Sequence, residues 1–301
     1  MLELMGMMLL LMLTGTFLRQ KNIITREGKK MLTDLILYVI LPCNIIKAFC
    51  IETGPQLWAK FSEVLLVSVG IQFLALIINK TMYGMMKDGE KQVYQYGTVC
   101  SNAGFMGNPL SQAVFGDIGL LYASIFLIPQ RIVMWTAGVA YFTKDSDKKG
   151  LMRKVMLHPC MIAVYIGLVL MATGAELPGV LMNSISSFSS CCTAMTMMYI
   201  GTILSDVDWK TLVSPKQLYF AFIRLIFIPG VILFLCRLIG MDPLVTGASV
   251  FLSAMPAGAT SSLLALKYGA DELAAAKSVV LTTSLSVVTL AFWSIILKGM
   301  I

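Results

Sequence analysis

The sequence predicts an all-α membrane protein with ten transmembrane helices. Hydrophobic residues make up 57% of the 301 residues and charged residues only 13%, whereas soluble domains carry about 25% charged residues. The mean hydropathy is +0.82. The chain also divides into apolar segments long enough to cross a bilayer, for which a helix needs about 20 residues. These segments cover residues 2–19, 31–50, 57–79, 92–116, 118–143, 157–174, 179–204, 215–239, 243–268 and 272–297.

The basic residues indicate how the spans are oriented. Seventeen of the 23 Lys and Arg residues fall in the linkers that follow spans 1, 3, 5, 7 and 9 or at the span ends beside them. The side of a membrane protein with excess Lys and Arg faces the cytoplasm, so both termini are expected outside the cytoplasmic membrane. Topology also accounts for the net charge of +7, and no nucleic-acid partner is expected. One such linker carries Lys144, Lys148, Lys149, Arg153 and Lys154.

The sequence lacks the side-chain patterns of an enzyme or a metalloprotein. The seven cysteines all fall within spans without metal-ligand spacing, and His158 is the one histidine. Buried cysteines usually behave as small hydrophobes. No nucleophile–base pair, phosphate loop or pair of intramembrane carboxylates is found. We therefore expect neither enzymatic activity nor a resident cofactor, while coupling to Na⁺ or H⁺ stays open.

Span 4 contains a stretch that a regular helix cannot continue, Ser101-Asn102-Ala103-Gly104-Phe105-Met106-Gly107-Asn108-Pro109-Leu110. Proline lacks an amide hydrogen and clashes with the preceding turn, but Asn followed by Pro is a good helix start. The stretch predicts a helix that ends near Gly104 and restarts at Pro109, with Gly107 in the break. Irregular backbone at membrane depth persists only where protein or a watery cavity satisfies it, which makes this stretch the first candidate binding site.

The chain also divides into two halves, at residues 1–149 and 150–301. Each half has five spans, so the halves have opposite orientation, as in the inverted repeats of transporters. The fourth span of the second half is also interrupted, at Ser253-Ala254-Met255-Pro256-Ala257-Gly258-Ala259-Thr260-Ser261-Ser262. We therefore predict that Pro109 and Pro256 are symmetry-related and that Gly258 belongs to the second break.

Several motifs in this order resemble the auxin efflux carrier family. They are Thr14-Gly15 to Lys30, Tyr38-Val39-Ile40-Leu41-Pro42, Asn102 to Pro109, His158-Pro159 to Leu177-Pro178, Tyr199-Ile200-Gly201-Thr202-Ile203-Leu204, Met255-Pro256-Ala257, and Thr282 to Leu290. The resemblance is to a bacterial member and covers nearly the whole chain. It implies two inverted five-helix repeats with the fold of bile-acid/sodium symporters, in which broken helices 4 and 9 cross. It further implies a homodimeric scaffold of spans 1, 2, 6 and 7, an elevator-like transport domain of spans 3–5 and 8–10, and relatives that carry malate, malonate or auxin.

Polar residues at the two breaks and two arginines suggest an anion site. The start of a helix presents unpaired amides and about half a positive charge, and Asn102 and Asn108 can donate amide hydrogens there. Arg131 and Arg224 lie near the centres of spans 5 and 8 with no carboxylate at comparable depth. An arginine in such a position costs about 2.5–3.5 kcal/mol on insertion scales and usually marks function. The other candidate substrate-binding residues are Asn44, Gln130, Ser253, Thr260 and Ser261.

These observations predict a secondary transporter of a small organic anion, such as the dicarboxylates malate and malonate. Two alternatives remain. One is a carrier of an amphipathic, auxin-like monocarboxylate, and the other is a ligand sensor that keeps the fold without transport. For the polar residues the alternative role is to cap broken backbone or to join helices, as Ser, Thr and Asn do in membranes. For each arginine it is to brace free carbonyls at the breaks or to reach an interface.

Overall fold

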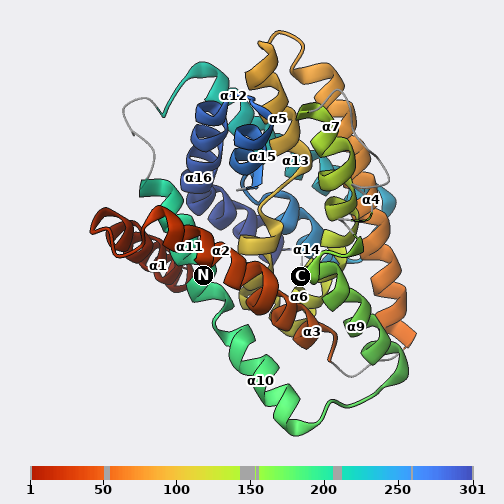
Figure 1. Ribbon diagram of the computed structural model, residues 1–301. Coiled ribbons are helices and arrows are strands. Elements are labelled where there is room, and N and C mark those ends of the chain that lie inside the picture. Colours follow the sequence, from red (N-terminus) through yellow and green to blue (C-terminus); the bar gives the residue numbers. More distant parts are fainter. Residues whose placement is uncertain are drawn as a thin grey trace. The chain divides into compact units, whose positions relative to one another are not determined.

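The computed structural model describes residues 2–50, 55–142, 153, 156–205, 212–258 and 260–299, most of which are helical (Figure 1). The chain forms two compact units. Unit 1 comprises Met1–Phe61, Gly104–Ser124 and Met156–Asp206, and unit 2 comprises Ser62–Ala103, Ile125–Val155 and Val207–Ile301. The predicted boundary between residues 149 and 150 lies outside the described residues, as do Lys144, Lys148, Lys149 and Lys154.

Unit 1 contains the helices of predicted spans 1, 2, 6 and 7 and the start of α6. These elements are α1 (Leu2–Gln20), α2 (Arg26–Leu35), η1 (Ile36–Ile40), α3 (Leu41–Phe49), η2 (Ala103–Gly107, mostly in unit 1), α9 (Pro159–Thr173), α10 (Gly179–Ser190) and α11 (Cys192–Ser205). Helix α3 packs beside α9 (Figure 1), where Gly167 leaves room for the ring of Phe49.

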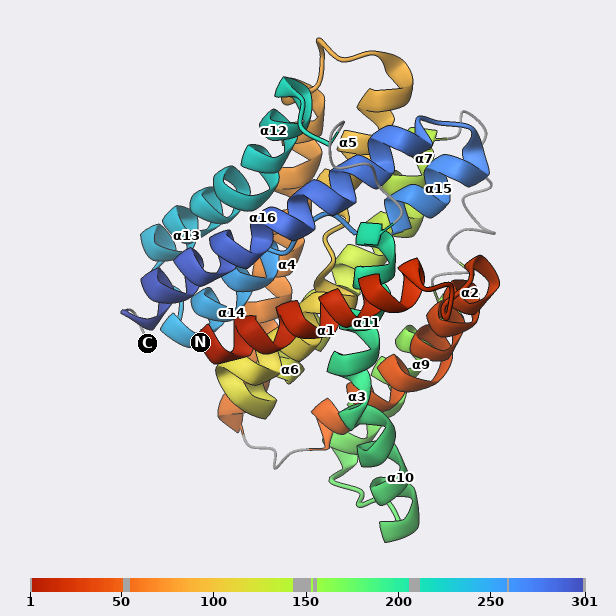
Figure 2. The same ribbon diagram turned by 90° about the vertical axis from the view of Figure 1, so that its left-hand side faces the viewer.

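Helix α1 crosses α11 in direct backbone contact (Figure 2). A Cβ atom added to Gly15 would overlap the backbone of Met198, and one added to Gly201 would overlap the backbone of Met12. Small residues allow such close approach of helices in membranes. The Thr16 hydroxyl completes the contact by donating to the Gly201 carbonyl at 2.9 Å.

Unit 2 contains the second group of helices. They are most of α4 (Pro55–Met82), α5 (Asp88–Val99), the end of α6 (Asn108–Val133), η3 (Met134–Gly138), α7 (Val139–Phe142), α12 (Pro215–Phe222), η5 (Ile223–Phe227), α13 (Ile228–Ile239), α14 (Pro243–Ser253), α15 (Thr260–Tyr268) and α16 (Glu272–Lys298). Helix α16 runs along α12 and η5 (Figure 2), and its Trp293 donates from Nε1 to the Leu225 carbonyl at 2.8 Å.

Three π-helical turns stand directly before helices that carry proline in their first turn. Segment η1 precedes Pro42 of α3, η2 precedes Pro109 of α6, and η5 precedes Pro229 of α13. Proline cannot donate to the carbonyl four residues earlier, and its ring clashes there. A π turn, whose hydrogen bonds reach one residue further, widens the helix at that point. The prolines therefore explain the local widening at these three positions.

Six helical segments are long and apolar enough to cross a membrane. They are Arg26–Phe49, Lys60–Met82, Ala103–Val133, Gly179–Ser205, Pro215–Ile239 and Leu273–Leu297, and Pro159–Thr173 and Pro243–Ser253 are shorter apolar helices. These helices confirm an all-helical, multi-span architecture in the described residues. The ten-span inverted repeat stays a prediction.

The second predicted break is confirmed, but the first lies earlier than expected. Helix α14 ends at Ser253 and α15 begins at Thr260, on either side of Pro256. Helix α5, however, ends at Val99 rather than near Gly104, and Cys100 is extended. Gly104 and Gly107 lie in η2. The α-helix restarts with α6 at Asn108, one residue before the predicted Pro109.

The boundary between predicted spans 4 and 5 is a single glycine inside α6. Gly116 has φ 72° and ψ −161°, outside the helical region. Residues other than glycine rarely adopt a positive φ. The backbone of Gly116 therefore interrupts α6, and its conformation favours glycine at this position. The sequence places the boundary at the same point, between residues 116 and 118.

Candidate functional site

The two helix breaks of unit 2 pair with each other through their backbones. Ser101 and Ala257 form an antiparallel bridge. The Asn102 amide donates to the Pro256 carbonyl at 2.8 Å, and the Gly258 amide donates to the Cys100 carbonyl at 2.9 Å. This pairing explains why α5 ends at Val99. It also means that Ser101 lies opposite the second break, while the symmetry relation of Pro109 and Pro256 stays a prediction.

Gly258 permits the two breaks to approach so closely. A Cβ atom at this position would lie 2.9 Å from the Cys100 sulfur and 3.1 Å from the Cys100 carbonyl oxygen. A larger residue would therefore push the two segments apart. The close contact with Cys100 thus explains why the break has a glycine at position 258.

Each break is also held by a side chain from a neighbouring helix. The Gln130 amide of α6 donates from Nε2 to the Ser101 carbonyl, and its Oε1 accepts from the Ser101 hydroxyl, both at 2.8 Å. On the other side the Ala257 amide donates to the Thr282 hydroxyl of α16 at 3.1 Å. The sequence predicts Gln130 as a substrate ligand. In the structure its side-chain amide instead bonds the carbonyl and the hydroxyl of Ser101 in the first break. Thr282 was missed, because no local pattern reveals a partner so far along the chain.

The three predicted hydroxyls also have partners near the second break. Thr260 accepts from the Tyr96 hydroxyl at 3.0 Å. Ser261 donates to the Gly258 carbonyl at 2.8 Å, and Ser253 donates to the Val250 carbonyl at 2.7 Å. Hydroxyls that bond carbonyls three residues earlier are common where helices start or end. In this structure the bonds of Ser253 and Ser261 stabilise the ends of α14 and α15.

Four polar side chains of unit 2 have buried atoms without a hydrogen-bond partner among the described residues: three follow Ser101, Gln130 and Thr282 directly in the sequence, and the fourth is Arg224 of η5. The atoms are Nδ2 of Asn102, Nη1 of Arg131, Nε of Arg224 and Oγ1 of Thr283. Asn102 is 3% exposed, Arg131 7% and Arg224 3%. A buried donor without a partner costs about 1–3 kcal/mol, and more if it is charged. Native proteins seldom retain several such groups in one region without a functional reason.

The two arginines occupy irregular helical positions in unit 2. Arg131 follows Pro129 and Gln130 in α6, and Arg224 lies in the π turn η5. Arg224 interacts electrostatically with Cys100 and with Tyr83. Burial raises the pKa of Tyr83, which lies just beyond α4, while the charge of Arg224 acts in the opposite direction. Arg224 therefore exerts its charge near the Cys100 end of the paired breaks.

The remaining predicted residues belong to unit 1. Asn108 is fully buried at the start of α6, and neither its Nδ2 nor its Oδ1 has a partner in the described part of the chain. Asn44 donates from Nδ2 to the Ser189 hydroxyl at 3.0 Å, which joins α3 to α10. Gly104, Gly107 and Pro109 also fall in unit 1. The structure thus brings Gln130, Pro256, Gly258 and Asn102 together in unit 2, with Thr260 beside them.

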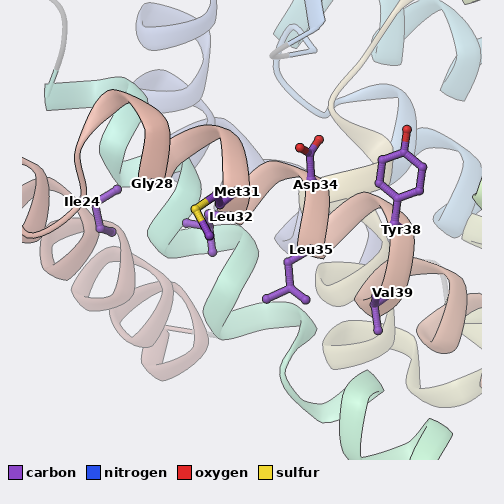
Figure 3. Close-up of a pocket in the computed structure, with 8 residues that line it drawn as sticks. All are labelled: Ile24, Gly28, Met31, Leu32, Asp34, Leu35, Tyr38 and Val39. Carbon is purple, nitrogen blue, oxygen red and sulfur yellow. The ribbon is translucent and has the colours of Figure 1, made fainter.

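Two grooves lie elsewhere and contain none of the predicted site residues. A groove of about 690 Å³ in unit 1 is lined by Ile24, Gly28, Met31, Leu32, Asp34, Leu35, Tyr38 and Val39, and Asp34 and Tyr38 project from the same side of the helix (Figure 3). A smaller one in unit 2, of about 130 Å³, lies where α5, α12 and α16 begin. No group of His, Cys, Asp or Glu side chains suited to a metal ion occurs among the described residues.

The apolar helices indicate a multi-pass membrane protein, and paired helix breaks are a feature of transporters. A family model described as "Membrane transport protein" matches residues 1–294. The chain therefore belongs to this family, which is the auxin efflux carrier family that its motifs resemble. Its members are transporters, and the protein is a membrane transporter rather than an enzyme.

Similar proteins cover nearly the whole chain at low identity. An uncharacterized transporter of Methanocaldococcus jannaschii is 24% identical over 96% of both chains. An uncharacterized transporter of Methanothermobacter thermautotrophicus is 21% identical, again over 96% of both chains. A protein of Rhizobium meliloti named "Putative malonate transporter" is 21% identical over 87% of this chain and 85% of its own.

Proposed function

We propose that the protein is a secondary transporter of a small organic anion, and specifically of a dicarboxylate such as malonate or malate. The observation that carries the proposal is the pair of buried arginines in unit 2, Arg131 and Arg224. Each has an unpaired buried nitrogen, and an arginine cannot lose its proton under physiological conditions. A bound carboxylate would supply both the missing hydrogen-bond acceptor and the missing negative charge.

The surroundings of the arginines also favour an anion. The unpaired Nδ2 of Asn102 is a further donor, and α15 begins at Thr260 immediately after the second break. The N-terminus of a helix favours negative charge. Two cationic side chains match two carboxylates better than one, and the name of the Rhizobium meliloti relative points to the same class of substrate.

The division into two units supports an elevator-like mechanism. Unit 2 contains the paired breaks and both arginines, whereas unit 1 contains the helices of predicted spans 1, 2, 6 and 7. In the proposed mechanism unit 2 carries the anion across the cytoplasmic membrane while unit 1 stays in place and forms a homodimer. Both termini would face outward, which accessibility labelling of tags at the two ends would test.

Uptake into liposomes tests the substrate. Purified protein should accumulate labelled malonate, and Arg131→Gln should reduce the initial rate by about 100-fold, because a charge-assisted contact of up to about 3 kcal/mol is lost. Arg237→Gln is the matched control, because Arg237 lies exposed at the end of α13 in the same unit. Full uptake by the Arg131 variant would refute the assigned site.

A ligand screen separates the dicarboxylate proposal from its alternatives. Malonate or malate should raise the unfolding temperature of the purified protein more than acetate or citrate does. A larger shift with indole-3-acetate would favour an auxin-like monocarboxylate instead. Repeating the screen and the uptake assay with sodium replaced by choline, and with a proton ionophore, would show whether Na⁺ or H⁺ drives transport.

A further inference from the structure

Among the described residues of unit 2, no carboxylate neutralises the charge of the buried arginines. Neither Arg131 nor Arg224 forms an ion pair in the part of the chain that the structure describes. The carboxylates of unit 2 that the structure describes lie at the start or in the first third of a helix. Glu90 pairs with Lys216, Asp242 caps α14 and Asp271 caps α16, Asp88 lies in the first turn of α5, and Glu63 lies in the first third of α4.

We propose that Arg131 and Arg224 are counter-charges that travel with the substrate, so that the buried site of unit 2 crosses the membrane field neutral when it holds a dianion and doubly positive when it is empty. This inference rests on the proposed function. The charge that crosses the field in a translocation step is that of the moving protein plus that of its cargo. Because both arginines belong to unit 2, they would move with the dianion and cancel its charge.

The proposal assigns voltage dependence to one half of the transport cycle. A membrane potential would not affect the loaded step, and it would act on the return of the empty carrier. A potential of 100 mV is worth about 2.3 kcal/mol per elementary charge. For two charges this corresponds to a change of about three orders of magnitude in the equilibrium between the two positions of the empty carrier, if the charges cross the whole field. If the arginines stayed in place instead, the dianion would cross uncompensated and the loaded step would depend on voltage.

The first test needs no substrate. Voltage steps applied to purified, substrate-free protein in a planar membrane should produce transient currents as unit 2 moves. Arg131→Gln and Arg224→Gln should each lower the moved charge by about half, and the double variant should abolish it. Arg131→Lys and Arg224→Lys, which keep the charge, should retain it, as should Arg237→Gln. Currents that are absent, or unchanged in folded Gln variants, would overturn the proposal.

The second test uses malonate in liposomes with a potential set by potassium and valinomycin. Exchange of labelled for unlabelled malonate should change less than about twofold between 0 and −100 mV, whereas net uptake should change by about tenfold or more. Saturating malonate should also suppress the transient currents. Exchange that depends as strongly on voltage as net uptake does would contradict the counter-charge role.

The two tests separate this inference from the proposed function. If malonate is neither transported nor bound, the proposed substrate is wrong, and the substrate-free currents still decide whether the arginines move through the field. If malonate is transported but the currents are missing, the proposed function stands and the counter-charge role fails. If the double Gln variant does not fold, the single Gln variants and the Lys variants provide the same comparison.

Discussion

Two sites bring backbones into close contact by different means. One is the contact between α1 and α11 in unit 1, and the other is the pair of helix breaks in unit 2. At the first, two regular helices meet because Gly15 and Gly201 have no side chains, and the nearby Thr16 hydroxyl has a carbonyl partner. At the second, the helices are interrupted and their backbones pair through Asn102 and Gly258. Buried polar atoms remain unpaired beside the second contact. The first arrangement is suited to holding a structure, and the second to binding a ligand.

Removing the small residue at the first contact should have the largest effect on stability. Gly15→Leu forces a side chain into the backbone of Met198, and we expect it to lower the free energy of unfolding by about 3 kcal/mol or more. Thermal unfolding in detergent would measure the change. Gly6→Leu is the control on the same helix, because Gly6 is exposed with nothing near its added Cβ. Equal effects at the two positions would contradict the tight contact.

Removing the Gln130 side-chain amide should have the next largest effect, because it leaves the Ser101 carbonyl and hydroxyl without their partner. Gln130→Leu should lower the free energy of unfolding by about 2 kcal/mol, from two lost bonds of about 1 kcal/mol each. Gln112→Leu is the control on α6, because the Gln112 amide bonds the exposed Asp117. A Gln130 variant as stable as the control would show that Gln130 does not support the break.

Thr282→Val tests the other brace and should cost less, about 1 kcal/mol, because the bond to the Ala257 amide is lost. The hydroxyl also loses its bond to the Ser278 carbonyl one turn earlier, which contributes little within a helix. Thr289→Val is the matched change on α16, since the Thr289 hydroxyl is buried without a partner in the described part of the chain. It should be neutral or slightly stabilising. Chemical denaturation of both variants measures the two changes in unfolding free energy. A larger loss for Thr289→Val than for Thr282→Val would contradict the role assigned to Thr282.

Asn102→Leu should have the smallest effect on stability and still impair function. Its Nδ2 has no partner to lose, so we expect an unfolding free energy within about 0.5 kcal/mol of the wild type. Malonate affinity should fall by about tenfold, which corresponds to one lost hydrogen bond of about 1.4 kcal/mol. Calorimetric titration with malonate measures this change. A variant that is destabilised yet binds malonate normally would make Asn102 a structural residue.

The sequence predicts the features that depend on local chemistry. The apolar segments, the break at Pro256, the restart next to Pro109 and the span boundary near residue 116 all follow from composition and proline. The burial of Arg131 and Arg224 also follows from their place within apolar spans. Each of these features can be predicted from the nearby residues, without information about distant parts of the chain.

Features that depend on tertiary pairing were not predictable in this way. Helix α5 ends at Val99 because Cys100 and Asn102 pair with residues of the second break, and Gly104 alone suggested a later end. The role of Thr282 and the contact between Gly15 and Met198 depend on the same kind of information. The sequence around a glycine or threonine in an apolar span does not show whether that residue contacts a distant part of the backbone or lipid.

The π turn η5 has a consequence for the direction in which Arg224 points. A π turn holds one more residue than the α-helical turn it replaces, and each residue of an α-helix advances the side chain by about 100°. Deleting one residue from Ile223–Phe227 together with Pro229→Ala would restore a regular helix without changing its phase at either end. The residues of α12 and α13 would keep their faces, while the residues of the widened turn, Arg224 among them, would be spaced differently around the helix axis. The position of this charge therefore depends on the extra residue in the π turn as well as on the identity of residue 224.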